Sequence, residues 1–463
     1  MTLTLIARGD PGFEQARTEA VWNGRRPDRL PDLIAQATDA EAVVAAVGIA
    51  KARGLKISIR SGGHNFVGAS VRDGGMLLDV SALDAVAVDP DARRAVVGPG
   101  CQGETLLQHL RPHGLAFGVG HCPSVAVGGF LLGGGMGFNP GAWGYGCMSV
   151  AGIDVVTADG ALRHASADHD PDLFWAARGG GPGFFGVVTA YHLDLHPDPV
   201  ALASSTYIYP LDALDEVAAW LEGNADTLDP ILEPMIWIGN LEGHTVGALD
   251  DDAAPHGAHG DDQRVVMLNA VAFATSRPQA EQALQPLDAC PANARALSRD
   301  VARASTFTDL FDFQRVLYPP GLRYAVDCQW TDTPPATQPL TALREHLEQA
   351  PSARTHALWQ MPFANHHGPL PDMALTHLGR FFVSFYTVWE SPDDDARNER
   401  WLREATGLLD PISTGHYAGD VDLLASPTRA QRTLSATHWE RFGELRARFD
   451  PDGLFREHLR PSA

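Results

Sequence analysis

The sequence predicts an α+β fold in which a glycine-rich unit is followed by a sheet-and-helix unit. Three observations predict it. The chain has 463 residues, more than the roughly 250–300 that one hydrophobic core usually supports, so two domains or one large insertion are expected. Up to residue 200 short strands and helices alternate with glycine loops. Beyond it the glycine density falls, and helices alternate with candidate strands in the manner of an antiparallel sheet with helices packed on it.

Composition and charge exclude several function classes. Hydrophobic residues make up 44% of the chain and charged residues 20%, which argues against disorder. The formal charge is -22, from 35 basic and 57 acidic residues, and no basic run offsets it. Such a surface repels nucleic acid and anionic lipid. The chain shows no signal peptide and no apolar run of roughly 18–20 residues, so we expect a soluble, cytoplasmic protein with a small-molecule partner. The sequence does not indicate an oligomeric state.

The five cysteines are odd in number and irregularly spaced. This pattern argues against a disulfide framework and against zinc sites of the CxxC type.

The first elements follow from periodicity and caps. Residues 1–35 are expected to be a surface segment. Residues 38–53 place valines on one face, with Thr38 or Asp39 as N-cap and Gly54 as C-cap, which predicts an amphipathic helix. Further strands are predicted at 55–59, 75–80, 94–98, 114–118 and 153–160, with a helix at 101–111.

Residues 128–146 are very rich in glycine. The run cannot pack a core of its own, and a flexible linker is one interpretation. Bulky apolar residues are interleaved with the glycines, including Phe130, Phe138, Trp143 and Tyr145. This mixture favours a backbone brought close to a flat ligand.

The second unit is expected to carry an antiparallel sheet. Helices are predicted at 211–223, 277–287, 338–349 and 393–407, and strands at 204–209, 235–239, 264–274, 324–330, 356–363 and 381–389. An acidic stretch, 249–262, contains His256 and His259 and is most simply a solvated loop, with metal binding as the alternative. His366 and His367 lie in a similar loop with the same two interpretations, and no metal site is predicted. In the tail, Ser426 and Pro427 are predicted to begin the last helix.

Common sequence motifs for nucleotide binding and for a catalytic nucleophile are absent. Gly133-Gly134-Gly135-Met136-Gly137-Phe138 lacks the register of a dinucleotide-binding GxGxxG, and neither GxSxG nor a Walker A pattern occurs. The glycine loops therefore need another ligand.

Four segments of the sequence together resemble a known protein family. Arg60-Ser-Gly-Gly-His64-Asn65, Gly120-His-Cys122-Pro-Ser124-Val125-Ala-Val-Gly128-Gly129, the triple glycine, and Asp172-Leu-Phe-Trp-Ala-Ala-Arg-Gly-Gly-Gly occur in that order. As a set they resemble the berberine-bridge-enzyme-like branch of the vanillyl-alcohol-oxidase flavoprotein family. The resemblance covers roughly residues 20–200 and 412–457. It implies a two-part FAD-binding domain, 1–200 with 412–463, and an inserted substrate domain, 201–411.

The resemblance also implies FAD held by two covalent bonds, one to His64 and one to Cys122. Both bonds raise the redox potential of the flavin. The other residues expected to bind the cofactor are Arg60, Ser61, Gly62, Gly63, Asn65, Gly68, Ala69, Gly120, Ser124, Val125, Gly128, Gly129, Gly134, Gly135, Gly137, Trp143, Val155 and Tyr417. Backbone N–H groups of residues 61–65 can form a nest for the diphosphate. In the family a valine at the position of Val125 goes with oxygen access, which favours an oxidase.

The substrate side departs from the family pattern. Trp143 stands where a tyrosine is usual, and Asp420 replaces the second aromatic of a common Tyr-x-Asn-Tyr. Tyr417 is the first candidate for the catalytic base, followed by Asp420 and Tyr145. Trp237, Gln360 and Arg380 are candidates to line the pocket, with packing as the alternative.

The function implied is an FAD-dependent oxidase that takes a hydride from an alcohol, C–H or C–N carbon of a natural-product-type substrate and reduces O2 to H2O2. The alternatives are a carbohydrate (oligosaccharide) oxidase, a dehydrogenase with another acceptor, and a flavin-carrying protein without turnover.

Overall fold

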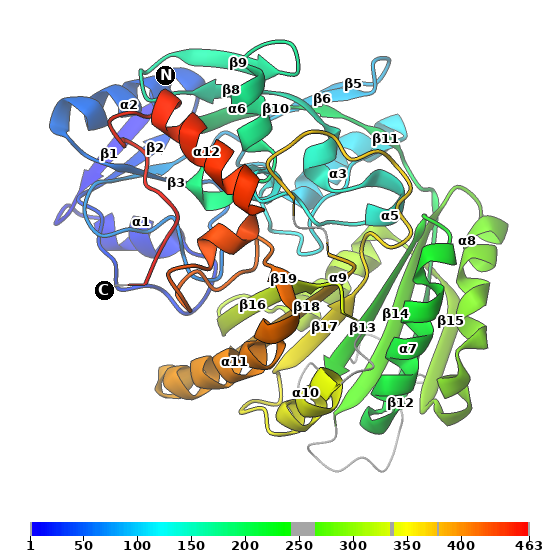
Figure 1. The fold of residues 1–463 in the computed structure, drawn as a ribbon. Helices are drawn as coiled ribbons and strands as arrows, with labels where there is room; N and C mark the ends of the chain where they lie inside the picture. The colour runs from blue at the N-terminus through cyan, green and yellow to red at the C-terminus, as the bar shows by residue number, and fades with distance from the viewer. Residues whose placement is uncertain (1, 242–263, 334–337, 377–378, 462–463) are drawn as a thin grey trace.

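The computed structural model describes residues 2–241, 264–333, 338–376 and 379–461. The acidic stretch 249–262, with His256 and His259, lies outside these residues. The fold is mixed α and β, as predicted, and combines a large antiparallel sheet with smaller sheets built from strands between residues 3 and 197 (Figure 1).

Two sheets and a small pairing build the glycine-rich part. The first sheet has the order β1-β2-β4-β3 and the second β5-β6-β10-β8-β9, and β7 pairs with β11. The strands are β1 (Leu3–Ala7), β2 (Leu33–Ala37), β3 (Ile57–Arg60), β4 (Met76–Asp79), β5 (Val86–Asp89), β6 (Arg94–Val97), β7 (Leu115–Ala116), β8 (Val150–Val156), β9 (Leu162–Ser166), β10 (Val187–Asp194) and β11 (His196–Pro197).

The segment 1–35 is more than a surface extension, which corrects the prediction. β1 pairs antiparallel with β2, and β2 pairs in parallel with β4, so this segment supplies half of the first sheet. Phe13 and Ile34 are buried in a core of their own. The short strands carry too few alternating positions to stand out in the sequence.

The helices of this part are α1 (Phe13–Glu19), α2 (Ala40–Arg53), α3 (Gly103–Leu110), α4 (Val127–Leu132), α5 (Pro140–Trp143) and α6 (Pro171–Ala177). The predicted limits of α2 are confirmed. Asp39 is the N-cap and accepts a hydrogen bond from Ala42 N–H, and Gly54 ends the helix at φ 64°. Parts of the glycine-rich run form α4 and α5, so it is not a linker.

An eight-stranded sheet forms the second part, in the order β15-β12-β14-β13-β17-β18-β16-β19. Every neighbouring pair is antiparallel, as predicted. The strands are β12 (Ala201–Pro210), β13 (Leu232–Gly239), β14 (Val265–Ala274), β15 (Ser298–Ser305), β16 (Arg323–Thr331), β17 (His356–Gln360), β18 (Phe381–Trp389) and β19 (Ser413–Gly415).

Four helices cover one face of this sheet, and α9 (Phe307–Leu317) and the glycine-rich part lie against the other face. α7 (Leu214–Asn224), α8 (Arg277–Leu284), α10 (Gln338–Glu348) and α11 (Asp395–Leu409) lie on the same side in Figure 1. Strand residues such as Leu268, Trp359 and Phe385 pack against them in the largest core. Because side chains alternate along a strand, Asn269, Leu358 and Tyr386 point to the opposite face. The helix α9 was not predicted.

The chain ends on the glycine-rich part. α12 (Ala436–Phe449) lies over the blue and cyan elements in Figure 1, and it packs against α6. Its N-cap is Ser435, not Ser426 as predicted. Residues 427–434 instead form turns and a short 3₁₀ helix, because Pro427 suits a turn as well as a helix start. The domain limits at 200 and 411 stay a prediction.

No helix among the described residues is both long and apolar enough to cross a membrane.

Candidate active site

A cavity of about 340 Å³ lies between the glycine loops and the face of the eight-stranded sheet that carries α9. Its wall on one side comes from residues 57–66, 120–133 and 181–188. Its wall on the other side comes from β13, β14, β17, β18 and α9. The C-terminal segment adds Tyr417–Asp420 and Phe455–Arg456. All three regions of the chain therefore meet at one cavity.

The two glycine loops hold each other closely. Gly129 N–H donates to Ser61 Oγ at 3.1 Å. A Cβ at Gly62 would lie 2.7 Å from Cβ of Ala126, and one at Gly128 would lie 2.8 Å from Ser61 Oγ. Only glycine permits this approach. The backbone N–H groups of residues 62–65 make no hydrogen bond within the described part of the chain, so they remain available to a ligand.

His64 is held in the cavity wall between an aromatic ring and a hydroxyl. Its imidazole stacks on Trp22 with centroids 4.2 Å apart, and Nε2 lies 3.2 Å from Ser124 Oγ. Burial lowers the pKa of His64 to about 4. The imidazole is therefore neutral at pH 7, with a free electron pair on one ring nitrogen.

Cys122 and Val125 enter the same cavity from the second loop. Burial raises the pKa of the Cys122 thiol to about 12, and the negative charge of Asp420 adds to the effect. The thiol is thus protonated at pH 7 before any ligand binds. Cys101, Cys147, Cys290 and Cys328 are also free but do not line the cavity.

Asp420 is a carboxylate in an apolar, aromatic setting. Tyr386 OH donates to its Oδ2 at 3.2 Å. Burial raises the pKa of Asp420 to about 6, against the lowering effects of this hydrogen bond and of His121. Asp420 is therefore mostly ionised at pH 7 while remaining a good proton acceptor.

A second layer orients Tyr386 and its neighbour Tyr318. The His356 ring stacks on Tyr386 with centroids 5.1 Å apart and planes 5° apart. His356 Nδ1–H donates to the Arg354 carbonyl at 3.0 Å, so Nε2 accepts from Tyr318 OH at 3.1 Å. Both tyrosines line the cavity. The network fixes their hydroxyls beside Asp420.

A second carboxylate joins the loop to the sheet. Glu233 on β13 accepts a hydrogen bond from His121 Nε2 at 2.6 Å and another from Asn139 N–H at 2.8 Å. Both Glu233 and His121 line the cavity. The glycine-rich part is thus tied to the sheet that roofs it.

Tyr417 has its hydroxyl turned to the backbone. Its oxygen accepts from Gly135 N–H at 3.2 Å and from Met136 N–H at 3.0 Å. Burial and the charge of Asp420 raise its pKa above the ordinary value for tyrosine. Tyr417 remains a neutral phenol that anchors the triple glycine. Tyr145 is fully buried and does not line the cavity.

The cavity gathers most of the predicted cofactor residues, but some lie behind its wall. Those that line it are Arg60, Ser61, Gly62, Gly63, His64, Asn65, Ala69, Gly120, Cys122, Val125, Gly128, Gly129 and Tyr417. Those that do not are Gly68, Ser124, Gly134, Gly135, Gly137, Trp143 and Val155. Trp143 is not at the pocket because it stacks on His196, with planes 9° apart.

Of the three residues of the second part that were candidates to line the pocket, Gln360 alone lines the cavity. Trp237 does not line it and lies instead beside His356, with ring centroids 5.7 Å apart. Arg380 forms an ion pair with Asp226 at 2.8 Å and also lies outside the lining.

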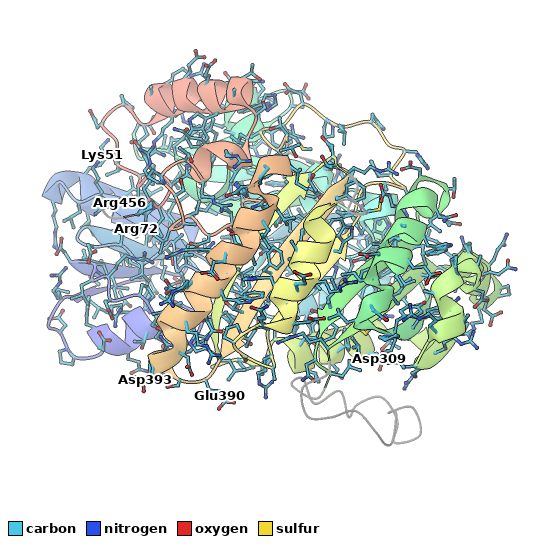
Figure 2. The ribbon with its side chains drawn as sticks, turned by 60° about the horizontal axis from the view of Figure 1, so that its bottom comes forward. Lys51, Arg72, Asp309, Glu390, Asp393 and Arg456 are labelled. Atoms are coloured by element: carbon cyan, nitrogen blue, oxygen red, sulfur yellow. The ribbon has the colours of Figure 1, made fainter. Side chains whose placement is uncertain are left out.

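Two arginines of the cavity were not predicted. Arg72 and Arg456 lie near each other in Figure 2 although they come from opposite ends of the chain. Both hydrogen-bond to backbone carbonyls, and neither forms an ion pair with a described residue. Burial, with the charges of Arg29 and Arg456, lowers the pKa of Arg72 to about 10, so it stays cationic at pH 7. Arg60, the predicted cation, is instead neutralised by Asp79 at 3.0 Å.

Comparison with known proteins shows an FAD binding domain in the part of the chain that contains the glycine loops. Residues 31–166 match the FAD binding domain family. The protein is an FAD-linked oxidoreductase. It is 29% identical over 430 residues to the FAD-linked oxidoreductase nodO of Hypoxylon pulicicidum, covering 92% of this chain and 91% of that protein.

Solved structures show the same fold. The crystal structure of 6-hydroxy-D-nicotine oxidase from Arthrobacter nicotinovorans superposes with a TM-score of 0.82 at 22% identity, over 100% of this chain and 98% of that one. Berberine bridge enzyme from Eschscholzia californica superposes with a TM-score of 0.80 at 19% identity, over 100% and 97%. This FAD-linked oxidoreductase therefore has the fold of the berberine-bridge-enzyme-like branch, as the resemblance implied.

The residues of the cavity fit FAD. The unpaired N–H groups of residues 62–65 and the cationic Arg72 and Arg456 suit a diphosphate, since backbone donors and guanidinium groups both bind phosphate oxygens. The apolar wall suits a flat ring system.

Proposed function

We propose that this protein is an oxidase with bicovalently attached FAD, which oxidises an alcohol or amine carbon of an apolar, ring-containing small molecule. The observation that carries the proposal is the convergence of His64, Cys122, Val125 and Asp420 on one cavity, opposite an apolar sheet face.

His64 and Cys122 would hold the flavin from two different loops. A neutral imidazole, favoured by the lowered pKa of His64, is the form that can bond to an electron-poor carbon. The thiol of Cys122 must lose its proton to react, and its raised pKa disfavours that loss while no cofactor is bound. Arg72 and Arg456 would neutralise the diphosphate.

Bound FAD would supply the hydride acceptor, and O2 would be the proposed oxidant that restores it. The chain's own contribution is the removal of a proton and the positioning of the substrate.

Asp420 is the proposed proton acceptor. Its carboxylate faces the cavity, its pKa of about 6 suits proton transfer near neutral pH, and Tyr386 holds it through one hydrogen bond. Tyr417, the first candidate from sequence, has its hydroxyl occupied by two backbone N–H groups and a raised pKa. We therefore assign Tyr417 a positioning role at the triple glycine.

The sheet side of the cavity favours an apolar substrate. Apolar and aromatic side chains are the majority on this wall, among them Phe313, Leu317, Tyr318, Leu358, Phe382 and Tyr386. Four polar side chains, Glu233, Asn269, Gln314 and Gln360, are spaced among them. A sugar carries a hydroxyl on nearly every carbon and needs a dense set of hydrogen-bond partners. A natural-product-type alcohol or amine fits this wall better than a carbohydrate.

Val125 supports O2 as the electron acceptor. It lines the cavity with a short branched side chain, and a longer side chain there would fill space beside the ring. A dehydrogenase with another acceptor is the competing function.

The experiment is anaerobic reduction of the purified flavoprotein by a panel of aromatic and alicyclic alcohols and amines, set against mono- and oligosaccharides. The proposal predicts that a member of the first group bleaches the flavin absorbance, and that air restores it with formation of H2O2. Bleaching by sugars alone would contradict the substrate class. Slow restoration in air would indicate a dehydrogenase, and no bleaching by any compound would favour a flavin-carrying protein without turnover.

A further inference from the structure

Three side chains that can ligate a metal converge on the second sheet, away from the cavity. Asp154 lies on β8, His164 on β9 and His192 on β10. Asp154 Oδ1 is 2.8 Å from Nδ1 of His164 and 3.2 Å from Nε2 of His192. The two imidazole centroids are 4.9 Å apart, with planes 85° apart. One ligand atom from each residue lies within 4.8 Å of the other two.

The register of the sheet brings them together. Asp154 is directly opposite His164 in the pairing of β8 with β9. His192 is opposite Gly152 in the pairing of β10 with β8. Because Gly152 and Asp154 are two residues apart on one strand, all three side chains project from the same face.

Gly152 makes room for the cluster. A Cβ at this position would lie 3.1 Å from Cε1 and 3.3 Å from Nε2 of His164. A larger residue would push the His164 ring away from His192. Glycine in the middle of a strand often marks such a close approach.

His192 has an unsatisfied nitrogen in this cluster. Its Nε2 is shielded from solvent and makes no hydrogen bond within the described residues, although Asp154 lies close. The side chains of Asp154, His164 and His192 are 33%, 50% and 30% exposed, so water can reach the site and complete a coordination shell.

The cluster is separate from the flavin cavity. Val188 and Tyr191 on β10 line that cavity. They pair with Val155 and Ile153 of β8, which alternate with Asp154 along the strand and point to the other face. An ion bound here would not touch the cofactor.

We propose that Asp154, His164 and His192 bind one divalent transition-metal ion of the zinc class. Two imidazole nitrogens and one carboxylate oxygen are the donors that Zn²⁺ prefers when it keeps a water ligand. Donors at about 2.0–2.2 Å from one ion lie roughly 3.4 Å from one another, so small side-chain rotations close the site. The ion would link β9, β8 and β10 and act as a brace of this sheet.

The test is titration of the flavin-loaded protein, stripped with a chelator, with Zn²⁺ in a calorimeter. We expect about one ion per chain at this site and a rise in the melting temperature. His164→Ala and His192→Ala should each weaken binding at least about 100-fold, since losing a ligand costs more than losing a residue that only orients one. Asp154→Asn keeps the side-chain shape and should weaken binding in the same direction.

His113→Ala, at an exposed histidine on another part of the surface, is the matched control and should bind as the unchanged protein does. Retained flavin absorbance shows that each variant is folded. The proposal is overturned if the protein does not bind Zn²⁺ saturably. It is also overturned if the double variant His164→Ala/His192→Ala binds with unchanged stoichiometry and affinity, which would place the ion on other ligands.

Discussion

At the scale of single residues, Asp420 is the side chain on which the proposed chemistry depends. It combines an ionisable group, an apolar setting and one neutral hydrogen-bond donor, Tyr386. Replacing it with asparagine preserves the shape and removes the proton acceptor. We expect Asp420→Asn to slow flavin reduction by about 10²–10⁴-fold, measured by anaerobic stopped-flow absorbance. Asp393→Asn, at an exposed aspartate labelled in Figure 2, is the control.

The same residue sets a pH dependence. Because the pKa of Asp420 is raised to about 6, the proton-accepting carboxylate is lost as the pH falls below 6. Flavin reduction should rise by about tenfold per pH unit up to pH 6 and level off above it. A variant Asp420→Asn with the original rate and pH profile would return the role of base to Tyr417.

Val125 is the residue proposed to control the reoxidation of the reduced flavin by O2. Val125→Leu should slow the reoxidation of reduced flavin by O2 by about tenfold or more, which corresponds to about 1.4 kcal/mol in the barrier. Its rate of reduction by substrate should change little. Val200→Leu, at a side chain that is 69% exposed, serves as the control. Reoxidation of Val125→Leu at the original rate would contradict the role of this position in oxygen access.

At the scale of secondary-structure elements, a buried ion pair ties the C-terminal segment to the large sheet. Arg429 lies 3.1 Å from Asp327 of β16, and both are nearly inaccessible to solvent. Burial, more than any other cause, raises the pKa of Asp327 to about 7, while Arg429 lowers it. The folded state therefore binds more protons than the unfolded state between about pH 4 and pH 7, and this pair's contribution to stability falls as the pH rises through that window.

Arg429→Met should lower the free energy of unfolding by about 3–5 kcal/mol at pH 8, because it leaves a buried carboxylate without its partner. The loss should be smaller at pH 5, where Asp327 takes up a proton instead. Denaturant unfolding at both pH values measures the difference. Arg460→Met, which removes an exposed ion pair with Glu457, should change stability little. Equal losses at both pH values would contradict the role given to Asp327.

The elements differ in how far the sequence predicts them. α2 has valines at helical spacing and caps at both ends, so its limits were predicted correctly. Six of the eight strands of the large sheet were predicted because they are long and apolar, whereas the polar β15 and the short β19 were missed. The two faces of the predicted strands could not be distinguished. Tyr386 was therefore missed, and Trp237, a candidate to line the cavity, packs instead beside His356. Tyr318 was missed because it follows α9, which was not predicted.

At the scale of the whole molecule, the N-terminal part and the C-terminal segment of the chain meet at the cavity. Ile57 N–H donates to Leu454 O, and Arg456 N–H donates to Ile57 O, both at 2.7 Å. This pairing extends the first sheet past β3 and sets Arg456 beside Arg72. The glycine loops could be found in the sequence because their residues are contiguous. Arg456 and the Asp154, His164 and His192 cluster could not, because only the tertiary fold brings their members together.

Arg72→Met/Arg456→Met should weaken the first, noncovalent binding of FAD. Each charge-assisted hydrogen bond contributes about 1.5–3 kcal/mol, so loss of one such bond corresponds to about 10–100-fold in affinity. The measurement is the flavin content of protein purified at limiting FAD. Arg460→Met is again the control, and unchanged loading would show that other groups neutralise the diphosphate.

The most direct test of the account is the absorbance of the protein after acid precipitation. We predict that the unchanged protein carries its yellow flavin into the pellet, that His64→Ala and Cys122→Ala each still do so through the remaining bond, and that the double variant releases flavin into the supernatant. Release of flavin from the unchanged protein would contradict the central claim that these two side chains anchor FAD covalently.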